Sequence, residues 1–352
     1  MSKVNIKLAA GTDVGLVRKN NEDNFVVNGD LQKESWIIPS ASETIALGEY
    51  GALLVVADGM GGTNAGEVAS AIAIETIQQK FSQDNLKELL SGKDNVSEKT
   101  VCEFMAAAIK AADLNINNRS KEDSSTQGMG TTIVILWLIG EKAYVSWCGD
   151  SRCYVFNAES GISRLSKDHS YVQELVDAGK LDPENAFDHP YSNIITRCLG
   201  DKENRANPDF RSFEFRAGDS FLLCSDGLCG LCTDEYIMQI MVDYKDSLLD
   251  CKKALIEAAL SAGGYDNVTV GLCQIAIEGK SETKELENTL FSRPVKKSRK
   301  PFYILLIILI LLSTLSYVLF SNKVASILNN INSQKVDTAF VETDALNLNG
   351  EV

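Results

Sequence analysis

Short apolar runs separated by polar turns predict strands in much of this chain. Residues 132–137 and 143–147 are rich in Val, Ile and aromatic side chains, a composition typical of strands. The polar residues 140–142 between them predict a hairpin turn. Apolar runs of the same kind predict buried strands over 52–57, 221–224 and 268–272.

Longer segments instead repeat apolar residues every three or four positions, the spacing of an amphipathic helix. The strands and helices follow one another without a regular strand–helix–strand rhythm, which argues against a doubly wound parallel sheet. The spacing predicts helices over 65–81, 98–115, 234–241 and 247–262, and the pair Gly263-Gly264 is a typical helix end.

A run of 19 residues without charge, 302–320, follows a polar linker. Only Ser313, Thr314 and Ser316 interrupt its apolar side chains. At ~1.5 Å per residue a helix of this length spans ~28 Å, close to the hydrocarbon thickness of a bilayer. A buried core helix is the alternative, but this run is apolar on all faces and lies outside the folded domain. It is therefore predicted to be a transmembrane helix.

Basic residues are concentrated on one side of this run. Five of them, and no acidic residue, lie between Arg293 and Lys300, whereas only Lys323 and Lys335 follow the run. The positive-inside bias predicts a single-pass membrane protein whose large domain is cytoplasmic and whose last ~32 residues lie outside. The predicted parts are a domain over 1–276, a charged juxtamembrane linker over 277–301, the membrane span over 302–320 and a short polar extracytoplasmic tail over 321–352.

The chain is acidic, with a formal net charge of −14. Residues 1–290 contain 27 basic and 44 acidic side chains, a net charge of −17, so they would repel a nucleic-acid backbone and no nucleic-acid partner is expected. Nine cysteines, mostly in apolar runs, predict buried free thiols in a reducing compartment. Cys229 and Cys232 have zinc or redox spacing, but no second pair or nearby His completes such a site.

Acidic residues stand at the ends of several predicted strands. Asp58 and Asp226 each directly follow a strand, and Asp266 lies just before one. Glycines beside them clear space, and carboxylates so placed commonly hold a hard cation. A single Asp-Gly pair is more often an ordinary turn. Several at strand ends, together with Arg18 in the acidic segment 18–23, predict a metal site.

These segments resemble the metal-dependent, type 2C protein serine/threonine phosphatase family, and its bacterial-type members in particular. The resemblance covers roughly residues 5–276, in the family's order. The matching segments are Arg18 with Asn21-Glu22-Asp23, Asp58-Gly59-Met60-Gly61-Gly62 continuing to Gly66-Glu67-Val68-Ala69-Ser70, Gly130-Thr131-Thr132, Gly149-Asp150-Ser151-Arg152, Ile195-Thr196-Arg197-Cys198-Leu199-Gly200, Ser225-Asp226-Gly227-Leu228 and Gly264-Tyr265-Asp266-Asn267-Val268-Thr269-Val270.

The resemblance implies an α+β fold. It is a four-layer α/β/β/α sandwich of two antiparallel sheets flanked by helix pairs, followed in this chain by the C-terminal transmembrane helix. The resemblance also places the metals at one end of the sandwich, with a variable flap over 165–200 beside them. Residues 28–50 hold more polar side chains than a tight connection needs and are predicted to form a loop.

The implied activity is hydrolysis of phosphoserine and phosphothreonine monoesters in proteins by a water that two Mg²⁺ or Mn²⁺ ions activate. Asp58 would bridge the ions, the carbonyl of Gly59 would bind one of them, and Asp226 and Asp266 would hold the other. Oxygen ligands of this kind favour Mg²⁺ or Mn²⁺ over zinc. With Arg18, these three aspartates form the implied catalytic set.

The same resemblance gives the remaining site residues supporting roles. Glu22 and Asp23 would act through ordered water, and Arg18 would grip the substrate phosphate with its planar guanidinium. A surface ion pair with Glu22 is the alternative for Arg18. Asn267 would orient the site by hydrogen bonds. Asp150 would either contribute to a third metal or cap a turn between two strands, and the sequence does not separate these alternatives.

One position departs from many eukaryotic members, which have a histidine directly after the Asp-Gly pair. Met60 stands there, and a thioether cannot donate a proton, so the general acid stays open. The only histidines, His169 and His189, lie in the predicted flap. Each is expected to cap a helix or face solvent rather than to take part in catalysis.

The leading functional prediction is a membrane-anchored phosphatase acting on phosphorylated proteins. Membrane-bound serine/threonine kinases and their substrates are its expected partners. A catalytically inactive scaffold at the membrane is one alternative, but every expected aspartate is present. A small-molecule phosphomonoesterase is another alternative, which the sequence does not distinguish from the first.

Overall fold

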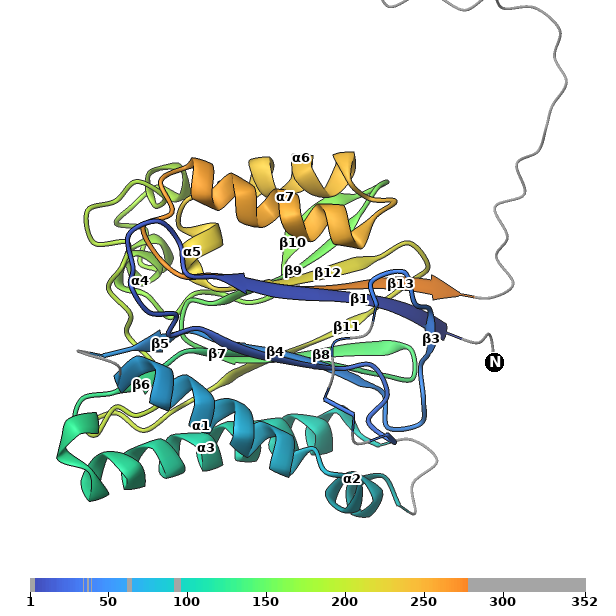
Figure 1. Ribbon diagram of the computed structural model, residues 1–352, viewed down its shortest axis with the longest axis horizontal. Helices are drawn as coiled ribbons and strands as arrows, with labels where there is room; N and C mark the ends of the chain where they lie inside the picture. Colours follow the sequence, from blue (N-terminus) through green and yellow to red (C-terminus); the bar gives the residue numbers. More distant parts are fainter. Residues whose placement is uncertain are drawn as a thin grey trace, which may run out of the picture. The chain divides into compact units, whose positions relative to one another are not determined.

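Two antiparallel sheets face each other in the computed structural model, and helices cover the outer face of each (Figure 1). The structure describes residues 4–33, 35–36, 38, 40–61, 65–91 and 96–277. Within these residues, every pair of neighbouring strands is antiparallel. The predicted α+β sandwich of antiparallel sheets is therefore confirmed for this part of the chain.

One sheet has five strands in the order β11-β8-β7-β4-β2. Its strands β7 and β8 form the predicted hairpin, whose turn contains Gly140 at a φ of 59°, a conformation that favours glycine. The bounds of its strands are β2 (Asn24–Asn28), β4 (Ala52–Ala57), β7 (Ile133–Ile139), β8 (Lys142–Cys148) and β11 (Asp209–Glu214).

The other sheet has six strands in the order β10-β9-β12-β13-β1-β3. The bounds of its strands are β1 (Val4–Asp13), β3 (Ile45–Ala46), β9 (Arg152–Asn157), β10 (Gly161–Arg164), β12 (Ser220–Cys224) and β13 (Val268–Ile277). Two short strands, β5 (Gly59–Met60) and β6 (Gly130–Thr131), pair with each other at one end of the sandwich (Figure 1).

Helices form the two outer layers (Figure 1). α1 (Ala65–Lys80) and α3 (Glu98–Glu122) cover the five-stranded sheet, and α2 (Gln83–Leu90) follows α1. α5 (Asp226–Cys229), α6 (Asp234–Asp243) and α7 (Leu248–Ser261) cover the six-stranded sheet. The connections contain α4 (Tyr171–Asp177) and the single 3₁₀ turns η1 (Ser124–Thr126) and η2 (Pro183–Asn185).

The continuous apolar run of β4 reflects burial on both of its faces. Leu53 and Val55 pack in the cluster that includes the side chains of α1 and α3. Leu54 and Val56 point the other way and pack between the two sheets. Since successive side chains of a strand alternate in direction, only a strand covered on both sides has apolar residues at every position.

The predicted helices form, and one of them is longer than expected. α3 continues to Glu122 instead of ending at residue 115. Two buried polar side chains of this helix, Asp113 and Asn117, form hydrogen bonds. Asp113 Oδ1 accepts hydrogen bonds from the amide of Gly200 (2.9 Å) and from Asn117 Nδ2 (2.9 Å). α2, α4 and α5 were not predicted, whereas the described residues between 28 and 50 are largely loop as expected, with β3 among them.

The segments predicted beyond residue 277 lie outside the described residues. They include the linker, the transmembrane helix over 302–320 and the tail over 321–352. Across the part of the chain that the structure describes, no helix is both long and apolar enough to cross a bilayer. The membrane span therefore stays a prediction.

The pairing of β1 with β13 brings distant parts of the chain together. Asp13, at the end of β1, pairs with Val268, at the start of β13. The residues that follow β1 therefore meet the residues that precede β13. Figure 1 shows the connection after β1 at the same end of the sandwich as β5, α4 and α5. The loops that carry the predicted site residues meet at this end.

Candidate active site

Asp58 lies between β4 and β5, and neighbouring threonines hold its backbone. Its amide donates to Thr132 Oγ1 (3.1 Å). Its carbonyl accepts from the Thr132 amide (2.8 Å) and from the Thr131 hydroxyl (2.8 Å). These bonds fix the direction in which the Asp58 carboxylate leaves the strand. Both threonines belong to a segment that the sequence singled out, but their role becomes visible only in the structure.

Gly59 lies where three stretches of backbone approach closely. A Cβ at this position would lie 2.3 Å from the Gly66 carbonyl oxygen and 2.4 Å from that of Glu22, so no larger residue fits. The Gly59 amide donates to the Glu22 carbonyl (3.2 Å), which also accepts from the Ser70 hydroxyl. The glycine therefore lets β5, the start of α1 and the segment with Glu22 meet beside Asp58.

Ser225 joins two of the predicted acidic segments. Its hydroxyl donates to Asp23 Oδ2 (2.7 Å), and its Oγ accepts from the Thr269 amide (3.0 Å). Asp226, the next residue, begins α5. Ser225 thus holds the Asp23 carboxylate beside the start of α5, although 202 residues separate Asp23 from Ser225. This role was not predicted, and its one local signal is the position of Ser225 next to Asp226.

Asn267 ties the loop after β1 to the start of β13. Its Oδ1 accepts from the Glu22 amide (2.8 Å), and its Nδ2 donates to the carbonyls of Val14 (2.9 Å) and Asn20 (2.9 Å). An asparagine side chain offers one acceptor and two donors, and here all three are used between the two loops. These are the bonds that a residue orienting the site would make.

Arg18 forms an ion pair with Asp266. Its Nη2 lies 2.6 Å from Asp266 Oδ2, and the two side chains are 51% and 36% exposed. Glu22, the alternative partner, is not the residue with which Arg18 pairs. The Glu22 carboxylate instead lies against Gly66, where a Cβ would be 2.9 Å from its Oε2. Arg18, the predicted phosphate-binding residue, therefore pairs with Asp266, a predicted metal ligand.

Burial raises the pKa of several carboxyls in this cluster. It is the main reason why the pKa of Asp23 rises to about 7. Burial also raises the pKa of Asp58 well above its usual value, with further contributions from the charges of Asp226, Asp23 and Asp150. The pKa of Asp226 is raised by burial and then by the charge of Asp266. Carboxylates this close destabilise one another unless a proton or a cation neutralises them.

Two buried oxygens of the cluster have no hydrogen-bond partner within the described residues. They are Oδ1 of Asp23 and Oδ1 of Asp150. Asp150 is only 6% exposed. A turn-capping carboxylate would use its oxygens on backbone amides, whereas an unpartnered oxygen among like charges fits a divalent cation. No three His, Cys, Asp or Glu side chains of the described residues converge on one point as metal ligands. The chemistry of the cluster fits a cation, while Asp266 is engaged by Arg18.

A cavity of about 860 Å³ opens beside the carboxylates. Its wall comes from the start of β9, the flap with α4 and η2, α5, the start of α6 and the loop before β13. The predicted flap therefore does lie beside the site. The charged residues of the lining are the acidic Asp150, Asp168, Glu184, Asp226, Asp234, Glu235 and Asp266 and the basic Arg152 and Arg164.

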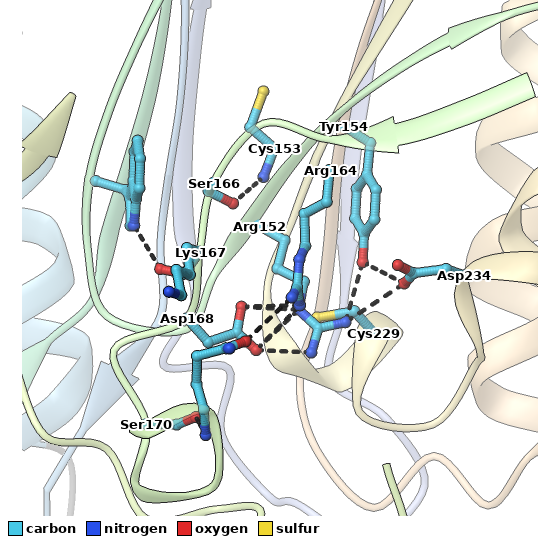
Figure 2. Close-up of polar contacts among 12 residues, drawn as sticks. Arg152, Cys153, Tyr154, Arg164, Ser166, Lys167, Asp168, Ser170, Cys229 and Asp234 are labelled. Atoms are coloured by element: carbon cyan, nitrogen blue, oxygen red, sulfur yellow. Dashed lines mark hydrogen bonds and ion pairs between the residues drawn. The ribbon is translucent and has the colours of Figure 1, made fainter. Parts of the chain in front are cut away.

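Figure 2 shows both of these arginines gathered around Asp168. Arg152 donates to the carboxylate of Asp168 through Nε (3.0 Å) and Nη2 (2.7 Å), and Arg164 Nη1 lies 3.4 Å from it. Arg152 also contacts Asp234 (3.5 Å) and the Tyr154 hydroxyl (3.1 Å), which itself donates to Asp234 (2.8 Å). Carboxylates therefore already neutralise both cations in the wall of the cavity.

His169 neither caps a helix nor faces solvent, so that expectation was wrong. Its residue is 5% exposed, and its Nδ1 accepts from the Gly149 amide (3.1 Å). Since Nδ1 is an acceptor, Nε2 carries the proton and points at Asp209 Oδ2, 3.1 Å away. Burial lowers the pKa of His169. The side chain holds the backbone next to Asp150 and has no free position from which to protonate a leaving group.

The cysteines are free thiols, as predicted. All nine lie in the described residues, and none forms a disulfide. Burial raises the pKa of thiols such as Cys153 and Cys251, the latter to about 12, which makes them unreactive. Cys229 and Cys232 are buried in the apolar cluster under α6 and α7 rather than in a metal site.

Comparison with known proteins identifies the family. The sequence profile described as Protein phosphatase 2C matches residues 44–262. Protein phosphatase PhpP of Streptococcus pneumoniae is 35% identical over 263 residues, which cover 74% of this chain and 94% of PhpP. Serine/threonine protein phosphatase PstP of Mycobacterium tuberculosis is 32% identical over 281 residues, 80% of this chain. The match spans about half of PstP, 47% of its length.

Solved structures agree with this assignment. The crystal structure of Mycobacterium tuberculosis PstP/Ppp has a TM-score of 0.62 at 33% identity and covers 77% of this chain and 98% of that one. The PstP catalytic domain in complex with two manganese ions has a TM-score of 0.59 at 32% identity, with 78% and 99% covered. The sandwiched sheets and the carboxylates at one end are those of a protein phosphatase fold. The chain belongs to the protein phosphatase 2C family.

Proposed function

We propose that this protein hydrolyses phosphoserine and phosphothreonine monoesters in proteins with the help of divalent cations. The observation that carries the proposal is the cluster of buried carboxylates beside Arg18. Within it the pKa values of Asp58, Asp23 and Asp226 are raised, and oxygens of Asp23 and Asp150 lack partners. Such a cluster is costly for a protein of this fold unless cations are bound there.

The residues that would hold two Mg²⁺ or Mn²⁺ ions are those at the strand ends. Asp58 would serve both ions, the carbonyl of Gly59 would bind one of them, and Asp226 and Asp266 would hold the other. When bound, the ions supply an activated water and offset the charge of the phosphoryl oxygens. Glu22 and Asp23 would act through ordered water, and Asp150 is the candidate for a third ion. The relative of this fold solved with two manganese ions supports the number and the kind of ion.

Arg18 binds the phosphate in this proposal. Its guanidinium is half exposed and already pairs with one carboxylate, so it can exchange that partner for a phosphate oxygen without crossing the protein core. The planar fork of donors suits a phosphate better than a lysine ammonium would. Arg18 therefore orients the phosphomonoester above the carboxylate cluster.

Two side chains are excluded as donors of the proton to the leaving alkoxide. Met60 has no proton to give. His169 uses one ring nitrogen to accept from Gly149 and directs the other at Asp209. The proton therefore reaches the leaving group from another source, which we infer to be water in the cavity.

The test is phosphate release from a phosphothreonine peptide by the full chain, with Mn²⁺, with Mg²⁺ and with excess EDTA. Activity is expected with either ion and none with EDTA, because the ligand set consists of oxygen donors. Full activity in excess EDTA would overturn the metal assignment. Metal binding without release of phosphate would favour the inactive scaffold. Hydrolysis of p-nitrophenyl phosphate but of no phosphopeptide would favour the small-molecule phosphomonoesterase.

The membrane anchor is part of the same proposal. The uncharged run over 302–320 and the five basic residues before it support a single span with residues 1–276 in the cytoplasm. An enzyme held there would meet membrane-bound proteins, so phosphorylated membrane-bound serine/threonine kinases and their substrates are the partners we infer.

A further inference from the structure

The cavity beside the carboxylates has a charge that the proposed chemistry does not use. Seven acidic and two basic side chains line it. Both arginines are already engaged, because Asp168 accepts from Arg152 and from Arg164 (Figure 2). The cavity therefore has no free cation in its described lining with which to bind a second phosphate. The acidic side chains outnumber the two arginines, so the cavity lining has a net negative charge.

Two of the acidic residues are free of any partner in the described part of the chain. Glu184 comes from η2 in the flap and Glu235 from the first turn of α6, and both residues are exposed. Neither belongs to the carboxylate cluster assigned to the cations. An extended carboxylate on the rim of a cavity is poised to meet a positive charge that enters it.

Apolar side chains also line the cavity. They include Val172 and Val176 of α4, Phe187 after η2 and Leu231 after α5. A surface with apolar walls and acidic edges matches a lysine or arginine side chain, whose aliphatic stem packs on apolar groups while its charged head stays at the polar edge. It does not match a phosphate or an acidic side chain.

We propose that this cavity binds a lysine or arginine side chain of the phosphoprotein substrate, close in sequence to the phosphorylated residue. This inference rests on the proposed function, since it names the substrate class of the same site. The cavity is continuous with the cluster, because Asp226 and Asp266 line both. A cavity of 860 Å³ is roughly 10 Å across, a distance that about three residues of extended chain cover. The basic residue therefore lies within about three positions of the phosphoresidue.

The experiment measures kcat/KM for phosphothreonine peptides that differ only in one residue near the phosphothreonine. That residue is Arg, Ala or Glu and is moved through the three positions on either side. An exposed pair of opposite charges changes an equilibrium by up to about fivefold, so two carboxylates predict a preference for Arg over Ala of up to about 25-fold at one position. The Glu184→Gln/Glu235→Gln variant should lower this preference to about twofold, and each single variant should lower it in part.

Charge reversal and a control variant sharpen the result. Glu184→Lys with Glu235→Lys should make the Glu peptide the better substrate. Glu257→Lys changes another exposed glutamate, which lies on α7 outside the cavity lining, and should leave the preference for Arg unchanged. All of these variants should hydrolyse p-nitrophenyl phosphate at the wild-type rate, since it has no neighbouring residue to place in the cavity.

Two outcomes overturn the inference: a wild-type enzyme with no preference for Arg at any position, or a preference that survives in the Glu184→Gln/Glu235→Gln variant. Either outcome is distinct from failure of the proposed function, which would show as loss of all phosphate release from peptides and from p-nitrophenyl phosphate.

Discussion

Asp168 is the carboxylate on which the cavity wall depends, and its replacement by asparagine tests that dependence. The side chains of Arg152 and Asp168 are only 18% and 10% exposed, and three nitrogen–oxygen contacts between 2.7 and 3.1 Å join them. Asp168→Asn keeps the shape but removes the charge and turns an amide N–H₂ group towards the guanidinium. Arg152 would then stay buried with Asp234 at 3.5 Å as its remaining carboxylate.

The expected loss of stability depends on the contacts that Arg152 still makes in the variant. Removing one member of a buried ion pair costs about 3–5 kcal/mol when the other charge is left without compensation. Here Asp234 and the Tyr154 hydroxyl still contact Arg152, so the lower end, about 3 kcal/mol, is expected. For a domain of this size, that corresponds to a Tm lower by roughly 6–12 °C.

Urea unfolding followed by tryptophan fluorescence is a suitable assay. Trp147 is buried, and its Nε1 donates to the carbonyl of Lys167, the residue before Asp168, so its emission reports on this wall. EDTA should be present, because bound metal would add its own stabilisation. Asp234→Asn is the matched control. The Asp234 side chain is 38% exposed, and its contact with Arg152 is longer, at 3.5 Å. Removing its charge should therefore lower the free energy of unfolding by about 1 kcal/mol.

The urea midpoints of the two variants show whether Asp168 stabilises the cavity wall. If Asp168→Asn unfolds at the same urea concentration as Asp234→Asn, then the contacts around Asp168 do not stabilise the wall as reasoned. An unchanged midpoint with a changed slope would point to an effect on the unfolded state instead.

Four further predictions concern the site and the anchor. Asp266→Asn should abolish turnover with the fold intact by circular dichroism, and near-wild-type rates would remove Asp266 from the ligand set. Arg18→Ala should raise KM for a phosphopeptide while Mn²⁺ affinity, measured by calorimetry, does not fall; an unchanged KM would return Arg18 to a surface ion pair. The folded-state pKa of Asp23, about 7, exceeds its usual value of 3.8, so the metal-free folded state binds the proton more tightly. The unfolding free energy measured in EDTA should therefore fall as pH rises between about 4 and 7, and this decline should be smaller in Asp23→Asn; an equal decline in both would contradict the assignment. Protease added to intact cells should remove a tag placed after Val352 and spare one placed before Ser2, and the reverse would refute the topology.

The parts of the fold that the sequence predicted are those in which one residue pattern has one structural cause. β4 is apolar at every position because both of its faces are buried, and the pattern shows it directly. Helix α7 ends where Gly263 and Gly264 take positive φ values, 127° and 53°, that favour glycine. The aspartates at the strand ends could be found for the same reason, since the strands beside them are unambiguous.

What the sequence did not show depends on pairs from distant segments. Asp168 meets Arg152 from 16 positions away, and Tyr154 meets Asp234 across 80 positions. Nothing in the local pattern of either residue reveals its partner. α4 is only seven residues long and too short for a clear period. His169 was misread because a histidine among polar residues looks exposed until the fold covers it.

The hydrogen bonds of Asn267 also bear on the order of events during folding. They join residues 245 and more positions apart in the chain, among the longest loop closures that this domain can make. Contacts of this kind form slowly, since the entropy of a long loop must be lost before they are gained. During synthesis β13 is the last strand of the domain to leave the ribosome. A nascent chain can therefore build most of both sheets and still lack a site, and phosphatase activity should appear only once the domain is complete.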